Sequence, residues 1–285
     1  MRIVGLSGGR RSGNNELMLQ TALAAAKQVC GEDLKLRDCI GCETCMRGLT
    51  TGGDGLCVVR DDDMPWFSAA VKEADALILA TPIYDLIPTG TVVTLLNRVL
   101  GIGKEYQTYC RTHPKIGAAM ALGGSDWINL TEPLMDLTVR NLSKGSVIVD
   151  KFVVGHNPAP SMVVLDEAVL ERAALLGRRV GEALMDREHA GFAGDSGVCP
   201  ACHCNLLEPR GGARVGCPYC DAEGTAVIRD GSLVVEWDAD KVRDNRFGPA
   251  GDAHHRADIA ASHKKAGENR ERIRQRVQEL EDFDG

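Results

Sequence analysis

Cysteine residues offer the clearest chemistry in this sequence, because nine of the eleven stand in two groups. The first group lies within residues 39–57 and the second within residues 199–220, while Cys30 and Cys110 stand alone. Thiols that recur at every third position converge on a metal, and free thiols in such numbers are typical of a reducing compartment. We therefore expect two metal-binding segments in a cytoplasmic protein, with disulfide bonds as the alternative.

The first group contains three thiols in close succession and a fourth that follows a glycine-rich stretch. Its members are Cys39, Cys42, Cys45 and Cys57. Three closely spaced thiolates wrap around a cuboidal iron–sulfur cluster, and a fourth thiolate from nearby completes the ligand set. The pattern predicts a [4Fe–4S] cluster, with structural zinc and free, redox-active thiols as the alternatives.

The second group contains two Cys-Pro-X-Cys knuckles and resembles a zinc ribbon, because a hairpin pattern with Asp230-Gly231 at its turn follows. The four knuckle thiols are Cys199, Cys202, Cys217 and Cys220. They suit a tetrahedral Zn²⁺ site, which supplies folding energy to a module too small for its own core. Cys204 is then the spare thiol and His203 a weak substitute ligand. Rubredoxin-type iron is the alternative metal.

A loop after the first apolar segment has the composition of an anion-binding site. Residues 7–16 read Ser-Gly-Gly-Arg-Arg-Ser-Gly-Asn-Asn-Glu and lead into a helical pattern. Backbone N–H groups at a helix start, with small hydroxyl and amide side chains, bind phosphate without a metal. The loop lacks the Lys-Ser/Thr ending of nucleoside triphosphatases and the G-x-G-x-x-G of dinucleotide folds. The alternative is a glycine turn that only permits close packing.

Apolar strands alternate with helices over the first 190 residues or so. Strands are predicted at 2–8, 33–37, 74–82, 115–122 and 146–154, and helices at 14–29, 64–73, 90–100, 128–142 and 165–188. Strands that are apolar on both faces indicate a parallel sheet covered on both sides. Five of them favour an open, doubly wound α/β sheet, in which ligands bind at the carboxyl ends of the strands. The loops 8–15, 39–62, 82–90 and 123–127 should gather at that edge.

Three of these loops together resemble those of the NADPH-dependent FMN reductase and iron–sulfur flavoprotein families. Residues 7–16 are similar to their phosphate loop, and Thr81-Pro82-Ile83-Tyr84 to the T-P-x-Y segment whose backbone embraces the isoalloxazine. Gly123-Gly124-Ser125 resembles their flavin-bordering glycine loop. The resemblance implies a flavodoxin-like domain with non-covalent FMN. The expected FMN-binding residues are Ser7, Arg10, Ser12, Asn14, Asn15, Pro82, Ile83, Tyr84, Asp85, Gly123, Gly124 and Ser125.

The cysteines of residues 39–57 resemble the compact motif with which iron–sulfur flavoproteins hold a [4Fe–4S] cluster beside FMN. The resemblance implies an FMN-dependent oxidoreductase that passes electrons between flavin and cluster. A simple NAD(P)H-dependent FMN or quinone reductase without a cluster is the second reading. A non-catalytic electron carrier or scaffold that docks a partner enzyme is the third. NAD(P)H or ferredoxin is the expected donor.

The relatives imply a homo-oligomer, a dimer or tetramer, with a redox protein as a further partner. No group of histidines, acids or nucleophiles identifies a catalytic residue.

Composition also suggests how the chain is divided and which partners are excluded. We expect an FMN-binding domain in residues 1–190, a zinc-ribbon-like module in 196–237, and a polar linker with a terminal helix in 238–285. The net charge is −7, and residues 198–247 carry six basic against eight acidic side chains, which opposes binding of nucleic acid. No run reaches the roughly 18 apolar residues that a membrane span needs.

Overall fold

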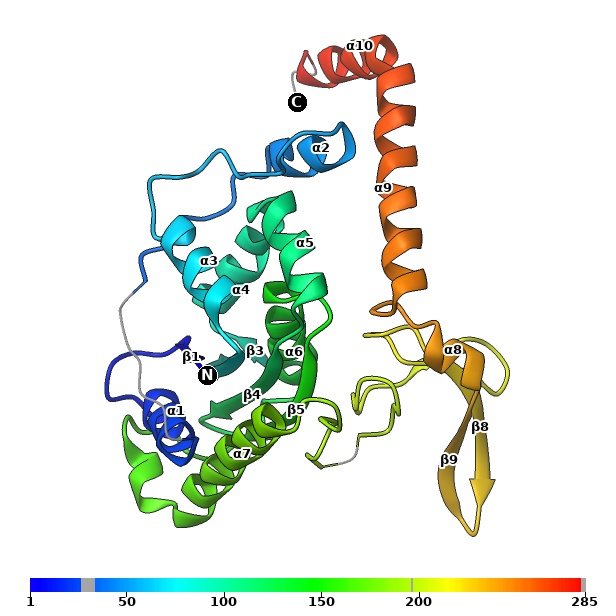
Figure 1. Ribbon diagram of the computed structural model, residues 1–285. Coiled ribbons are helices and arrows are strands. Elements are labelled where there is room, and N and C mark those ends of the chain that lie inside the picture. Colours follow the sequence, from blue (N-terminus) through cyan, green and yellow to red (C-terminus); the bar gives the residue numbers. More distant parts are fainter. Residues whose placement is uncertain (27–33, 196, 283–285) are drawn as a thin grey trace. The chain divides into compact units, whose positions relative to one another are not determined.

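The computed structural model describes residues 1–26, 34–195 and 197–282, and the chain divides into two compact units, Met1–Ser196 and Gly197–Gly285 (Figure 1). Among the described residues, no helix is both long and apolar enough to cross a membrane.

Four parallel strands form the sheet of the first unit, in the order β1-β2-β4-β5. They span Ile3–Ser7 (β1), Ala76–Tyr84 (β2), Ile116–Gly123 (β4) and Val147–Val154 (β5). A two-residue strand, Ile87–Pro88 (β3), pairs antiparallel with the end of β2. All 8 residues of β4 are buried, so helices must cover both faces of the sheet. The open, doubly wound α/β sheet that the sequence predicts is confirmed.

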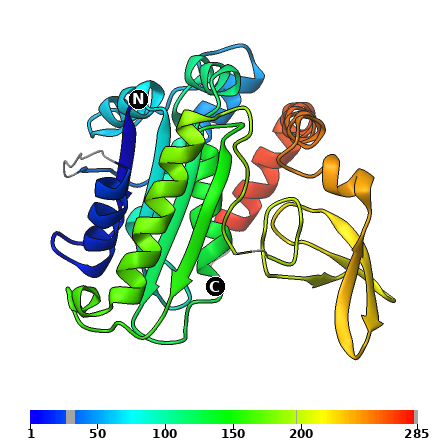
Figure 2. The same ribbon diagram turned by 60° about the horizontal axis from the view of Figure 1, so that its bottom comes forward.

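Two layers of helices pack against this sheet. One face carries Asn14–Ala25 (α1) and Glu167–Met185 (α7), and the other carries Met64–Glu73 (α3), Gly90–Arg98 (α4), Lys104–Thr112 (α5) and Thr131–Leu142 (α6). Figure 2 shows α7, in yellow-green, lying over the sheet and running along its strands. Neighbouring strand residues face opposite sides, so Ile78 packs with α1 and α7 while Leu77 and Leu79 pack with the other helices. Cys110, on α5, is buried in the second of these layers.

The strand expected at 33–37 is wrong for its described part, because residues 34–37 form no strand. The backbone N–H groups of Lys35 and Arg37 donate to the carboxylates of Asp63 and Asp62, at 2.7 and 2.9 Å. Side-chain oxygens thus take the hydrogen bonds that a neighbouring strand would supply. Residue 33, Cys30 and the expected helix end at 27–29 lie outside the described residues.

The second unit is a small antiparallel sheet followed by helices. The strands are Glu208–Pro209 (β6), Arg214–Gly216 (β7), Glu223–Arg229 (β8) and Ser232–Trp237 (β9). Asp230 and Gly231 have positive φ angles of 51° and 77°, so the predicted hairpin turn is confirmed.

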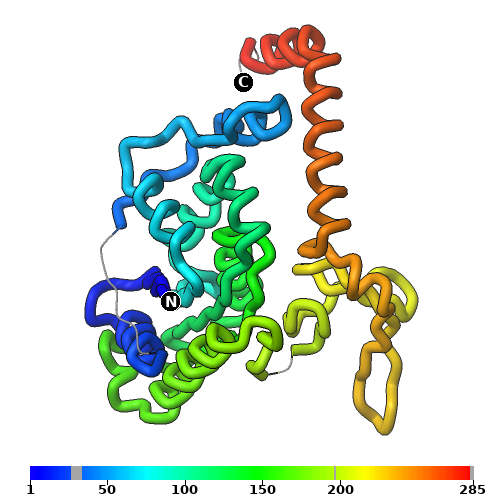
Figure 3. Tube along the Cα trace, in the orientation of Figure 1, coloured from blue at the N-terminus to red at the C-terminus, as the bar shows by residue number. Residues whose placement is uncertain are grey.

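Residues 238–255 are more regular than expected. Ala239–Arg243 (α8) starts where the Asp238 carboxylate accepts hydrogen bonds from two N–H groups, and Pro249–Glu268 (α9) has its proline in the first turn. The prediction of a single terminal helix is also wrong. The chain turns at Asn269, after α9, and continues as a second helix, Arg270–Glu281 (α10), as Figure 3 shows.

Candidate functional site

A cavity of about 1120 Å³ opens at the carboxyl ends of the parallel strands. It lies among the loop after β1, the loop between β2 and α4, the loop after β4 and residues 157–160. Nine of the twelve expected FMN-binding residues line it: Arg10, Asn14, Asn15, Pro82, Ile83, Tyr84, Asp85, Gly124 and Ser125. Ser7 and Ser12 border a neighbouring cavity instead, and Gly123 is buried beside Ile83 and Ile128.

The loop after β1 leaves polar groups free to meet a ligand. Gly13 caps α1 with extended backbone and no capping side chain, and the Glu16 carboxylate of the first turn accepts from the Ser12 N–H rather than from an N–H of the helix. The side chain of Asn15 is buried, and its Oδ1 has no hydrogen-bond partner among the described residues. A buried, unsatisfied amide is costly unless a ligand or water meets it. FMN fits this requirement, because it brings ribityl hydroxyl donors and a phosphate acceptor.

Asn14 has a role that the sequence did not indicate. Its Nδ2 donates to the carbonyl oxygens of Asn157 and Ala159, at 3.1 and 2.9 Å, and its Oδ1 accepts from the Val163 N–H at 3.0 Å. The side chain therefore ties the phosphate-type loop to the segment after β5. That segment supplies Asn157, Pro158 and Pro160 to the cavity wall, and the Asn-Pro-Ala-Pro run was the available signal.

The turn between β2 and β3 shapes the other end of the cavity. Asp85 and Leu86 both have positive φ angles, 47° and 77°, which are uncommon for residues other than glycine. The antiparallel pairing of β2 with β3 and a 2.8 Å hydrogen bond from Thr131 Oγ1 to the Leu86 carbonyl hold this turn. Tyr84 and Trp127, 68% and 63% exposed, stand at the rim. They are available to cover a flat ring.

A family model described as NADPH-dependent FMN reductase matches residues 1–156, more than half of the 285 residues. The chain belongs to this family. It is a flavin-dependent oxidoreductase by descent, as the loop resemblance predicted. The expected kinship with iron–sulfur flavoproteins is also confirmed, since two archaeal proteins of that description are 27% and 29% identical to it.

Particular relatives of this FMN reductase family member differ in how much of the chain they match. Flavone synthase cfoJ of Aspergillus candidus is 29% identical over 263 residues, 81% of this chain and 79% of its own. An iron–sulfur flavoprotein of Methanocaldococcus jannaschii is 27% identical over 204 residues, 65% of this chain and 97% of its own. A solved structure described as a flavone reductase has a TM-score of 0.75 over 98% of this chain and 97% of its own, at 24% identity. The last likeness shows a shared fold.

The first cysteine group lies on the flavin-type unit, on a loop that contains the helix Thr44–Thr50 (α2). Cys39 and Cys42 are exposed, whereas Cys45 and Cys57 are partly buried. Burial is the main cause that raises the pKa of Cys45, and the charges of Cys57 and Cys39 act in the same direction. Hydrogen bonds from the Thr44 hydroxyl and N–H lower the pKa of Cys42. One loop thus carries four thiols that could ligate a metal.

The second cysteine group is much more compact. The ligand atoms of Cys199, Cys202, Cys217 and Cys220 all lie within 4.8 Å of one another, and the four side chains are buried. No other such set of three or more potential ligands occurs in the described residues. A hydrogen bond with Cys202 lowers the pKa of Cys199 to about 7, which favours the thiolate that metals bind. The four residues fit a tetrahedral metal ion.

The two knuckles share one backbone pattern, and this explains why Cys204 stands outside the set. The Cys199 N–H donates to the Cys204 carbonyl at 3.1 Å, just as the Cys217 N–H donates to the Ala222 carbonyl at 2.8 Å. His203 and Asp221 both have positive φ, 57° and 67°. Cys204 therefore corresponds to Ala222, and it is not a fifth member of the metal-type set.

Proposed function

We propose that the protein is an FMN-dependent oxidoreductase in which FMN fills the cavity beside Asn15 and residues 39–57 hold a [4Fe–4S] cluster. The unsatisfied amide of Asn15, buried at a cavity of about 1120 Å³, is the observation that carries the flavin assignment. When bound, FMN exchanges one or two electrons and so links cluster chemistry to hydride chemistry. NAD(P)H or ferredoxin is the electron donor in this proposal.

Each wall of the cavity has a distinct task in this scheme. The N–H groups at the start of α1 receive the phosphate, and Arg10 offsets its charge. The strained turn at Asp85 directs backbone groups towards the flavin ring, and Gly124 lets the opposite loop approach it. Tyr84 and Trp127 limit the access of water from the rim.

The spacing of the thiols supports different metals for the two groups. A single tetrahedral ion needs four thiolates in close contact, as in the second group, whereas a cuboidal cluster separates its thiolates by the cluster itself. The more open first group suits a cluster better than zinc. We accordingly assign the cluster to Cys39, Cys42, Cys45 and Cys57, and Zn²⁺ to Cys199, Cys202, Cys217 and Cys220.

The flavin assignment is tested by placing one negative charge beside the phosphate. Asn15→Asp keeps the side-chain shape but adds repulsion of a few kcal/mol, so FMN should bind at least about tenfold more weakly. Asn97→Asp, an exposed position on α4, makes the same charge change outside the cavity and should bind FMN normally. Cofactor released by heat and identified by chromatography gives the stoichiometry. Wild-type protein that releases FAD, or no flavin after incubation with FMN, refutes the assignment.

A flat, conjugated carbonyl compound of the flavone class is the proposed substrate. Two relatives named for flavone chemistry match the chain across both units, and two exposed aromatic side chains stand at the rim of the cavity. The test is anaerobic: flavin reduced by NADPH or dithionite is mixed with a flavone, and reoxidation is followed by absorbance. Reoxidation by a quinone but by no flavone would instead favour the simple quinone reductase.

A further inference from the structure

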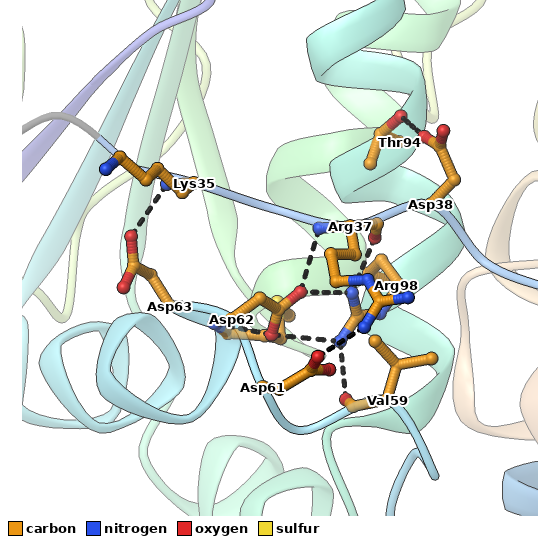
Figure 4. A network of polar contacts seen from close by, with 10 residues as sticks. Lys35, Arg37, Asp38, Val59, Asp61, Asp62, Asp63, Thr94 and Arg98 are labelled. Atoms are coloured by element: carbon orange, nitrogen blue, oxygen red, sulfur yellow. Dashed lines mark hydrogen bonds and ion pairs between the residues drawn. The ribbon is translucent and has the colours of Figure 1, made fainter.

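The last residue of α4, Arg98, lies beneath the start and the end of the cysteine loop (Figure 4). Its side chain is 1% exposed. Nη1 donates to the Arg37 carbonyl at 2.6 Å, and Nη2 donates to the Val59 carbonyl at 2.9 Å. Both nitrogens also bind the Asp62 carboxylate, which is equally buried. One guanidinium therefore joins the residue two positions before Cys39 to the residue two positions after Cys57.

Further bonds close the same stem, which we define as residues 35–38 and 59–63. The Arg37 N–H donates to Asp62 at 2.9 Å, and the Asp63 N–H donates to the Lys35 carbonyl at 3.1 Å. One turn before Arg98 on α4, Thr94 Oγ1 donates to Asp38 at 2.6 Å. Figure 4 shows Arg98 and Thr94 reaching from α4 to the two segments of the stem, with the Lys35–Asp63 contact farther along them.

Cys57 is fixed relative to Arg98 by a second route. Its N–H donates to the Gly101 carbonyl at 2.9 Å, and Gly101 ends the short 3₁₀ turn Val99–Gly101 that continues α4. The backbone that continues the helix of Arg98 therefore holds the last cysteine of the loop.

We propose that Arg98, paired with Asp62, is a positioning residue of the cysteine loop that holds its first and last thiols together whether or not a metal is bound. This inference rests on the proposed function, because positioning the thiols matters only if they hold a cluster. The hydrogen bonds of the stem themselves do not depend on the cluster. An ion pair between two buried groups adds a defined geometry, since the planar guanidinium reaches several acceptors at once, which a lysine cannot do.

The test compares pairs of substitutions that remove both charges, so that no buried charge is left alone. In Arg98→Met with Asp62→Leu the stem loses its central bonds. Arg140→Met with Asp136→Leu removes the 2.9 Å ion pair on α6, outside the stem, whose carboxylate is buried like that of Asp62, and is the matched control. Hydrogen exchange of iron-free protein reports on the Arg37, Cys57 and Asp63 amides. We expect at least about tenfold faster exchange there in the first pair and none of this change in the control.

Cluster release gives a second readout that a general loss of stability would not reproduce. In anaerobically reconstituted protein, a chelator should remove iron at least about tenfold faster from the Arg98/Asp62 pair than from the control pair, and Arg98→Lys should restore only part of the difference. Arg98→Lys, which keeps the charge but loses the planar set of donors, also provides a milder variant if the first pair does not fold.

Amide exchange and iron uptake distinguish a failure of the proposed cluster from a failure of the positioning role of Arg98. Wild-type protein that takes up no iron refutes the cluster, while the amide exchange still decides the role of Arg98. Unchanged exchange and unchanged iron release in folded Arg98/Asp62 protein refute the positioning role, even if the cluster is present. If that pair does not fold, Arg98→Lys is the test, and exchange at Cys57 and Asp63 equal to that of the wild type then refutes the positioning role.

Discussion

The two cysteine groups achieve convergence of their thiols in opposite ways. Only seven apolar side chains are buried in the described part of the second unit, and five of them are cysteines: Cys199, Cys202, Cys204, Cys217 and Cys220, beside Tyr219 and Ala222. In the first unit the cysteines of residues 39–57 are exposed or half-buried, and no member of that group belongs to the two hydrophobic clusters of the sheet. The thiols therefore form most of the core of the second unit, whereas in the first unit they lie outside the hydrophobic core.

This difference indicates whether metal binding organises the protein around the thiols or the folded protein organises the thiols. A module with so little apolar surface to bury needs its metal in order to fold, because metal binding there is folding energy. The cysteine loop instead extends from a sheet whose hydrophobic clusters contain none of its cysteines, and its stem is closed by Arg98 and Asp62. In the proposed scheme the metal therefore organises the second unit, whereas the folded flavin-type unit organises the cysteine loop. The predictions below test this contrast.

The largest expected effect is the loss of one ribbon thiol. Cys217→Ser should abolish zinc binding and unfold residues 197–237, because structural zinc in such knuckles contributes about 10–16 kcal/mol. The flavin-type unit should stay folded and keep its FMN. Limited proteolysis with mass spectrometry should show rapid cleavage after about residue 195 and a stable yellow fragment. Loss of FMN together with zinc would mean that the ribbon helps to build the flavin site.

The same type of substitution in the cysteine loop should have a local effect. Cys42→Ser should reduce iron from about four atoms per chain to nearly none, because one ligand of the cluster is removed. The midpoint of thermal unfolding and the FMN content should stay unchanged, because this side chain is exposed. Metal analysis of anaerobic protein measures the iron content, and calorimetry measures the midpoint of thermal unfolding. A large drop in the unfolding midpoint would remove the contrast with Cys217.

A smaller effect is expected where the flavin-type unit supports Cys57. A Cβ at Gly101 would lie 2.6 Å from Cys57 Cβ, so Gly101→Ala should displace this cysteine and cost about 1–3 kcal/mol in the free energy of unfolding. Gly181→Ala, on α7 with no atom within 4 Å of the new methyl group, should gain up to about 1 kcal/mol. Chemical denaturation gives both values, and chelator-induced iron loss should be faster only in Gly101→Ala.

The smallest effect should come from the spare thiol of the ribbon. Cys204→Ala installs the residue that the second knuckle already carries at Ala222, so zinc should remain at one per chain. The buried sulfur leaves a small void, with a cost of about 1 kcal/mol or less. The zinc content of the variant after dialysis against a weak chelator shows whether the metal is retained. Loss of the metal would make Cys204 a ligand and would overturn the assignment of the other four.

The sheet was largely predictable, because long apolar runs are forced into buried parallel strands. The runs 74–82, 115–122 and 146–154 correspond closely to β2, β4 and β5. The segment 33–37 instead alternates polar and apolar side chains. The N–H groups of Lys35 and Arg37 bond to Asp63 and Asp62, and nothing local signals that carboxylates will replace a strand. Tertiary hydrogen bonds decided its conformation.

The site was predictable where it consists of one contiguous loop and not where distant segments meet. Residues 7–16 and 82–85 carry their chemistry in adjacent side chains, and most of the expected residues line the cavity. Asn14 looked like a phosphate ligand but bonds to residues more than 140 positions away. The pairing of Arg98 with Asp62 likewise depends on the folded backbone, so no spacing in the sequence revealed it.

The bonds of Asn14 imply an order in which the two sites become complete while the chain leaves the ribosome. The cysteine loop needs nothing beyond α4 and the turn that follows, since the contacts of Arg98 span only 36 to 61 positions. The cavity wall is finished only when Val163 arrives, 149 positions after Asn14. Because synthesis runs from the N-terminus, a nascent chain can close its thiol loop before it can retain flavin, and the ribbon comes last.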